Sequence, residues 1–333
     1  MDKGHSAVLA CAGAVIGAGF ASGRETVTFF VQYGWHGWWL IVLAVMLMTA
    51  ICTLCMREAG RYGCDWTQLL PKNALASACP LVLMMLTAGA MLSAAGDLIA
   101  LVWHHPHAYI LGVAGTLWAA WRMGSKQLKI LHAASGALTL GLLCALMAAF
   151  QTHLQQTVAL ERQFSFTSLA VALVRAIGYA AMNMMLAIGV VCRSAYKTQN
   201  VAVTAGLFGW VICMLLFISQ WVYIRNPQAA DTAFPIITLL RAYGRSGYLA
   251  GVLLLYVSIA TSLASVFCAL QTALETRIQR RDIRWLIIGG IPLAVSGIGF
   301  EGIVDRLYAP AGLLCLIAVF LPIAFGRFRT ISP

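Results

Sequence analysis

Four glycines in the first apolar run could open a helix and expose its backbone groups to a ligand. They are Gly13, Gly17, Gly19 and Gly23, and each weakens a helix by roughly 1 kcal/mol relative to alanine. Because they form two pairs at four-residue spacing, one interpretation is close packing between helices. The other is a helix broken near Val15–Gly19, with freed carbonyls for a cation and exposed amides for an anion. The spacing alone leaves both interpretations open.

Polar side chains recur every four residues in the sixth apolar run. Arg175, Tyr179 and Asn183 share one helical stripe, and Gly178 permits a break beside them. A charged residue inside a membrane is costly and points to function, although Arg175 is near enough to the outer end to reach the interface. For Asn183, which is deeper, we favour a role in binding over a plain hydrogen bond between helices.

Hydroxyl groups line one face of the eighth apolar run. Ser258, Thr261, Ser262 and Ser265 follow the spacing i, i+3, i+4 and i+7. Hydroxyl oxygens and free carbonyls suit a hard cation such as sodium. Small-residue packing between helices favours the same residues, so the pattern alone supports both.

Two acids, Glu25 and Asp97, lie within apolar runs. A carboxyl group inside a membrane can carry a proton, and for Asp97 we favour a structural, hydrogen-bonded role. Glu25 directly follows Arg24, and either of them could pair with Arg175. These four residues are candidates for gating or proton transfer.

The composition predicts the elements that must hold these residues. Of 333 residues, 61% are hydrophobic and 10% charged, whereas soluble proteins average about 25% charged residues, so a soluble enzyme is excluded. A helical span needs about 20 apolar residues. We therefore predict an all-α polytopic membrane protein with about ten transmembrane helices in a single domain, residues 1–333. The expected spans are 6–32, 36–56, 77–103, 108–121, 130–150, 167–192, 199–224, 247–273, 285–300 and 308–326.

The spans form two sets of five, in residues 6–151 and 166–326, with similar lengths and a short fourth member in each. An odd number of spans per set makes the second copy enter from the other side, which predicts a 5+5 inverted repeat. With a cytoplasmic N-terminus, fifteen lysines and arginines lie inside and five outside. This bias predicts a multi-pass protein of the cell membrane with both termini cytoplasmic.

Motifs for other functions are missing from the sequence. There is no P-loop, HExxH or G-x-S-x-G motif, so we expect neither an enzyme nor a cofactor beyond a coupling ion. The net charge of +11 is explained by topology rather than nucleic acid. The expected partners are the bilayer and a small solute, and the sequence leaves the oligomeric state open.

The segment from Gly13 to Glu25 resembles the first-span motif of the YkvI-type bacterial membrane proteins. This family is in the amino acid–polyamine–organocation (APC) superfamily, with the leucine-transporter (LeuT) fold. Those relatives usually have GAGFASG followed by Gln-Glu, and here Arg24 replaces the glutamine. The pair Tyr179 and Asn183 is similar to the sixth helix of that family. The resemblance implies a 5+5 inverted repeat with helices 1 and 6 broken.

The resemblance also implies two binding sites. In sodium-coupled relatives a cation lies between first-helix carbonyls and eighth-helix hydroxyls, and the ligand lies beside the break. The sodium residues are then Gly13, Ile16, Ser258, Thr261 and Ser262, and the ligand residues are Gly17, Ala18, Gly19, Phe20, Tyr179 and Asn183.

The favoured hypothesis is a secondary active transporter of a small amino-acid-like or organic solute, coupled to sodium and working by alternating access. Helix dipoles at the breaks would bind the carboxylate of the solute. One alternative is proton coupling through Asp97 or Glu25. Another is a receptor subunit of the same fold that senses a solute without transporting it.

Overall fold

The computed structural model describes residues 3–123, 166–275 and 277–326, with residues 141, 144 and 147 between them. Within these ranges the chain is helical, without a β-strand. Six stretches are long and apolar enough to cross a membrane by length and composition. The all-helical class is thus confirmed for the described residues, the six apolar stretches agree with a polytopic membrane protein, and the count of ten spans stays a prediction. The expected fifth span, 130–150, is almost entirely outside the described residues. The six stretches are Val31–Tyr62, Ala74–Val102, Leu169–Ala195, Val201–Arg225, Pro235–Glu275 and Phe300–Ala324.

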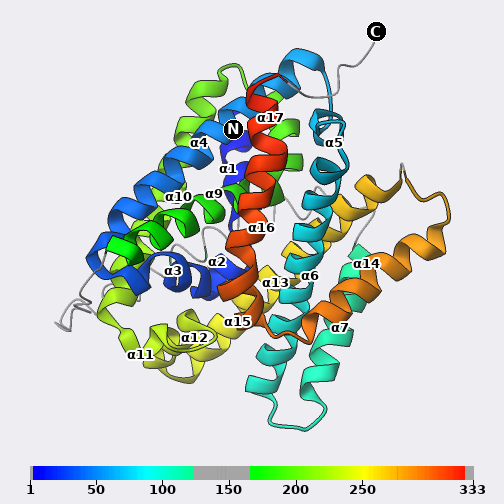
Figure 1. The fold of residues 1–333 in the computed structure, drawn as a ribbon. Helices are drawn as coiled ribbons and strands as arrows, with labels where there is room; N and C mark the ends of the chain where they lie inside the picture. Colours follow the sequence, from blue (N-terminus) through cyan, green and yellow to red (C-terminus); the bar gives the residue numbers. More distant parts are fainter. Residues whose placement is uncertain are drawn as a thin grey trace.

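Within each described range the helices follow one another with short connections (Figure 1). The first range holds α1 (Lys3–Val15), α2 (Ala18–Ser22), α3 (Arg24–Phe29), η1 (Val31–His36), α4 (Gly37–Tyr62), α5 (Trp66–Leu69), α6 (Ala74–Val102) and α7 (Ala108–Met123). The second holds α9 (Phe166–Ala195), α10 (Val201–Arg225), α11 (Pro227–Ala230), α12 (Pro235–Leu240), η2 (Arg241–Tyr243) and α13 (Gly244–Glu275). The third holds α14 (Arg281–Ser296), α15 (Phe300–Gly302), η3 (Ile303–Leu307), α16 (Tyr308–Cys315), η4 (Leu316–Phe320) and α17 (Leu321–Ala324).

Local residues set several helix ends. Asn73 begins α6, where its side chain accepts a hydrogen bond from the amide of Ala76 (2.6 Å). Asn200 begins α10 in the same way, and both are residues favoured at this position. Gly63 ends α4 in the left-handed region, at φ 61°, which glycine adopts without steric cost.

The first span is broken, which is one of the two interpretations of its glycines and the one that the family resemblance implied. The amide of Gly17 donates to the carbonyl of Val15 (2.8 Å) instead of that of Gly13, so the helical hydrogen bonding stops there. A second ladder starts when the amide of Ala21 donates to Gly17 (2.9 Å). Gly23, at φ 84°, then ends α2 and redirects the chain into α3. The break therefore frees the carbonyl of Gly13 from the helix.

The sixth span, in contrast, is one continuous helix, α9, so the predicted break of helix 6 is wrong. Gly178 has a different purpose, which is close contact with α16. A Cβ atom on Gly178 would lie 2.5 Å from the carbonyl oxygen of Ala309, and one on Gly312 would lie 2.0 Å from the carbonyl oxygen of Gly178. The glycines allow two backbones to touch, and α9 keeps its hydrogen bonds.

Two helices organise the packing. Helix α9 contacts α1, α4 and α16, whereas α6 contacts α7, α13 and α14. In Figure 1 the beginning of α1 and the end of α17 lie at the same end of the bundle, and α11 and α12 lie at the other. We call these the N-terminal end and the opposite end.

Candidate solute-binding cavity

A cavity of about 170 Å³ lies at the break of the first span. Its wall comes from α1, α2, α3, α5, α6, α9 and α13 and from the link between α1 and α2. Since one water needs about 10–15 Å³ of such a volume, the cavity has room for a small organic solute. The break and the cavity therefore coincide, as expected for a ligand site at unwound backbone.

Four of the five predicted sodium residues line this cavity: Gly13, Ile16, Thr261 and Ser262. A Cβ atom on Gly17 would lie 3.5 Å from Oγ of Ser262, so α13 presents this hydroxyl directly to the break.

The hydroxyls of Thr261 and Ser265 are hydrogen-bonded to carbonyls of α13 itself. The hydroxyl of Thr261 donates to the carbonyls of Val257 (2.9 Å) and Ser258 (3.1 Å), which leaves its oxygen lone pairs free to accept. Ser258 is buried and is not part of the cavity wall. The structure thus brings four of the predicted ligands together and leaves Ser258 outside.

The predicted ligand residues divide in the same way. Gly17, Gly19 and Asn183 line the cavity. The amide nitrogen of Asn183 donates to the carbonyl of Tyr179 (3.1 Å), which leaves its amide oxygen free to accept from a solute.

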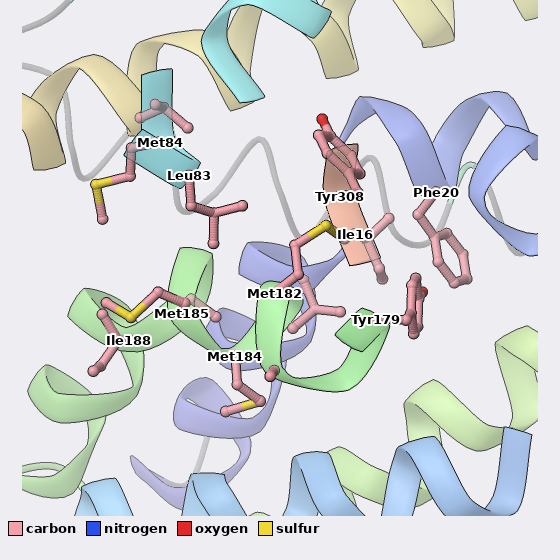
Figure 2. Packing of buried hydrophobic residues seen from close by; sticks show 14 of the residues in the cluster. Ile16, Phe20, Leu83, Met84, Tyr179, Met182, Met184, Met185, Ile188 and Tyr308 are labelled. Carbon is pink, nitrogen blue, oxygen red and sulfur yellow. The ribbon is translucent and has the colours of Figure 1, made fainter. Parts of the chain in front are cut away.

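The remaining three, Ala18, Phe20 and Tyr179, are buried behind the cavity wall. The ring of Tyr179 packs on Phe29 (4.9 Å between centroids) and Phe30 (5.1 Å). Figure 2 shows Tyr179 beside Phe20 in the buried core. Direct contact of these three side chains with a solute is therefore not supported.

Glu25 is the acidic residue of the cavity wall among the described residues. It is 5% exposed, and a Cβ atom on Gly19 would lie 2.0 Å from its Oε1. Within the described chain its Oε2 has no hydrogen-bond partner and the carboxyl forms no ion pair. The expectation that Glu25 or Arg24 pairs with Arg175 is wrong.

Arg24, although adjacent to Glu25, reaches a different region. Its guanidinium forms ion pairs with Asp305 (2.5 Å) and Glu301 (3.2 Å) and donates to the carbonyl of Thr232 (3.4 Å). It therefore joins α3 to the last span and to the segment before α12. This is the arrangement expected of a gate, for which Arg24 was a candidate.

Two further contacts reinforce this closure at Asp305, which lies in a π-helical turn. Thr28 donates to its carboxylate (2.6 Å) and Arg175 donates to its backbone carbonyl (2.9 Å). Arg175 also lies over the ring of Phe29, 5.6 Å from the centroid. The sequence analysis missed Asp305 and Glu301 because their partner is more than 270 residues away; the only signal was two acids directly before the last apolar run.

The cavity can be reached from the N-terminal end. Its wall extends to Arg193 and Thr272, both exposed, near the ends of α9 and α13. The described wall residues do not extend to α11 or α12. On that side Arg24 joins α3 to the last span and to the segment before α12.

Asp97 is not part of this site. It is half-buried on α6, outside the cavity wall, and accepts a hydrogen bond from Ser93 (3.5 Å). The geometry agrees with a structural acid.

Comparisons with known proteins give a structural match alone. No family model matches the chain, and no curated protein matches it. The crystal structure of a manganese transporter from Eremococcus coleocola, in complex with an aromatic bis-isothiourea substituted compound, aligns with a TM-score of 0.59 at 14% identity. The alignment covers 99% of this chain and 80% of the transporter. The chain has the fold of that transporter. At this identity the match concerns the fold of the chain and does not extend to its substrate.

Proposed function

We propose that this chain is a secondary active transporter, not an enzyme, that moves a small amino-acid-like or organic solute by alternating access. The observation that carries the proposal is a cavity at a broken helix, open toward one end of the bundle and closed toward the other by Arg24. A cavity of this kind can move a solute across the membrane if its closed end opens while its open end closes. The transporter fold of the neighbouring structure supports the proposal.

The proposed location and membrane topology rest on the sequence analysis. We propose a multi-pass cell-membrane protein with both termini cytoplasmic, so that the cavity in this structure opens to the cytoplasm. Ten spans in a 5+5 repeat, and membership of the YkvI-type family, belong to the same proposal.

Sodium is the proposed coupling ion. The freed carbonyl of Gly13, the carbonyl of Ile16 and the hydroxyls of Thr261 and Ser262 line one cavity. These are oxygen ligands of the type a hard cation prefers. Within the described residues no group of three His, Cys, Asp or Glu side chains could hold a metal ion, so the donor set does not favour manganese.

The test is thermal unfolding of the purified protein with a panel of amino acids, in sodium chloride and in choline chloride. A ligand that binds only the folded state raises the midpoint. We expect stabilisation that depends on sodium and weakens in Ser262→Ala. Ser219→Ala in α10, whose hydroxyl donates to the carbonyl of Leu215 (2.8 Å) outside the cavity wall, should keep the sodium dependence. Unchanged sodium dependence in Ser262→Ala would reject the assignment, and binding without counterflow in liposomes would indicate a receptor.

Proton coupling through Glu25 is the second candidate, because Glu25 is buried in the cavity wall and unpaired within the described chain. It predicts uptake driven by a pH gradient in sodium-free buffer. The absence of such uptake would exclude it. Asp97, which is outside the cavity, has no corresponding support.

A further inference from the structure

The deep end of the cavity has one formally charged side chain among the described residues, Glu25. We propose that Glu25 binds the ammonium group of a small organic cation, so that the solute is a protonated amine. This inference rests on the proposed function and specifies the substrate class of the same site.

Positive groups that could bind a carboxylate are directed elsewhere. Arg24 is engaged by Asp305 and Glu301, and Arg175 by the carbonyl of Asp305. Arg193 is at the open mouth, ten residues beyond Asn183 on α9, which is about 15 Å along a helix.

The helix dipoles expected to bind a carboxylate are also missing. Helix α9 is continuous past the cavity, so it offers no free amides there. Helix α2 has only five residues, and its few peptide dipoles sum to little. The electrostatics of the site therefore favour a cation over an anion.

The other polar groups suit an ammonium group better than a divalent metal. An ammonium group donates up to three hydrogen bonds, and Glu25, the amide oxygen of Asn183 and the hydroxyl of Ser262 can accept them. A divalent metal needs six or more oxygen ligands, with several carboxylates, whereas this wall supplies one carboxylate in the described chain. Met84 and Met91 provide an apolar surface for the carbon skeleton of the amine.

An ammonium group forms an ion pair with Glu25 only when the carboxyl group is ionised, so bound solute and a proton on this carboxyl group exclude each other. The titratable groups that face it are the buried hydroxyls of Tyr179 on α9 and Tyr308 on α16, neither of which is a cation. On its own helix, Arg24 is turned to Asp305. Across the cavity, α6 and α13 contribute hydroxyl, thioether, thiol and apolar side chains. Proton and solute therefore compete for one carboxyl group.

The test compares three probes with one carbon skeleton, by thermal unfolding of the purified full-length chain. Alaninamide carries an ammonium group only, alanine carries ammonium and carboxylate, and propionate carries the carboxylate only. We expect alaninamide to raise the midpoint and propionate to leave it unchanged. Glu25→Gln should weaken alaninamide binding by roughly ten- to a hundredfold, the range for a hydrogen bond to a charged group.

Asp97→Asn is the matched control, because it removes a carboxyl group from an apolar helix outside the cavity; it should bind alaninamide as the parent chain does. If Glu25→Gln fails to fold, the parent chain supplies the answer through pH: alaninamide affinity should fall as the pH decreases. Four results would each overturn the proposal: no response to alaninamide, stabilisation by propionate alone, unchanged alaninamide affinity in Glu25→Gln, or alaninamide affinity independent of pH.

Failure of the cation site can be distinguished from failure of the transport function. Alaninamide binding without counterflow in liposomes contradicts transport and leaves the cation site standing. Counterflow of propionate without any response to alaninamide supports transport and rejects the cation site.

Discussion

At the scale of residues, the adjacent side chains of Arg24 and Glu25 contact different parts of the molecule. Arg24 and Glu25 both lie in α3, where successive side chains point about 100° apart. Glu25 is turned to Gly19 and the cavity, whereas Arg24 is turned to Asp305 and Glu301. One turn of helix thus links the binding site to the contacts that close it.

The Arg24–Asp305 pair should contribute measurably to stability. Its side chains are 15% and 32% exposed, and groups that share a network typically couple by 0.5 to 3 kcal/mol. A double-mutant cycle with Arg24→Ala and Asp305→Ala, followed by thermal unfolding in detergent, should give a coupling free energy of about 1–2 kcal/mol.

The chain contains a matched control for that cycle. Arg284 pairs with Glu275 at 3.2 Å, but Glu275 is 71% exposed, and exposed pairs contribute about 0–1 kcal/mol. This cycle should show less coupling than the first. Equal coupling in the two pairs would mean that Arg24 and Asp305 form an ordinary surface contact, not a structural closure.

At the scale of elements, the same residue type was predictable in one place and not in another. The dense glycines from Gly13 to Gly23 allowed a break between α1 and α2, because a helix with that composition is locally weak, and the family resemblance favoured it over close helix packing. Gly178 was given the same interpretation and is instead a packing residue against Gly312. The sequence does not show which distant helix will approach a glycine, so the two roles cannot be separated in advance.

The sequence analysis likewise predicted only a part of the candidate site. Hydroxyl spacing on the eighth run placed Thr261, Ser262 and Ser265 on one face, and all three line the cavity, because helical periodicity fixes which side chains share a face. Ser258 and Tyr179 lie behind the cavity wall. Periodicity shows which side chains share a face of a helix, but it does not show how far the helix is rotated about its axis relative to the cavity. The contact of Asp305 with Arg24 could not be predicted, because the two residues are far apart in the sequence.

The contact between α9 and α16 should be intolerant of a methyl group. Gly312→Ala would place Cβ 2.0 Å from the carbonyl oxygen of Gly178, and the two backbones must separate. Overpacking of this kind costs about 1–3 kcal/mol, which thermal unfolding in detergent would detect as a lower midpoint. Gly206→Ala in α10, where nothing lies within 4 Å of the added atom, should not lower the midpoint. A Gly312→Ala variant as stable as Gly206→Ala would contradict the observed packing.

At the scale of the whole molecule, one binding cavity communicates with one end of the bundle. The Arg24 contacts join α3, the last span and the segment before α12 at the opposite end. The N-terminal end has exposed cavity residues at Arg193 and Thr272. Transport requires that the closure at Arg24 opens while the N-terminal end closes.

The central claim is access to this cavity from one side at a time, and Ser262→Cys tests it without knowledge of the solute. A membrane-impermeant thiol reagent is added to right-side-out and inside-out vesicles, and the parent chain corrects for native Cys268, which also lines the cavity. The account predicts fast reaction from the N-terminal side, slow reaction from the opposite side, and a faster reaction from the opposite side once Arg24→Gln is added. Equal rates from both sides in Ser262→Cys alone, or no increase with Arg24→Gln, would contradict it.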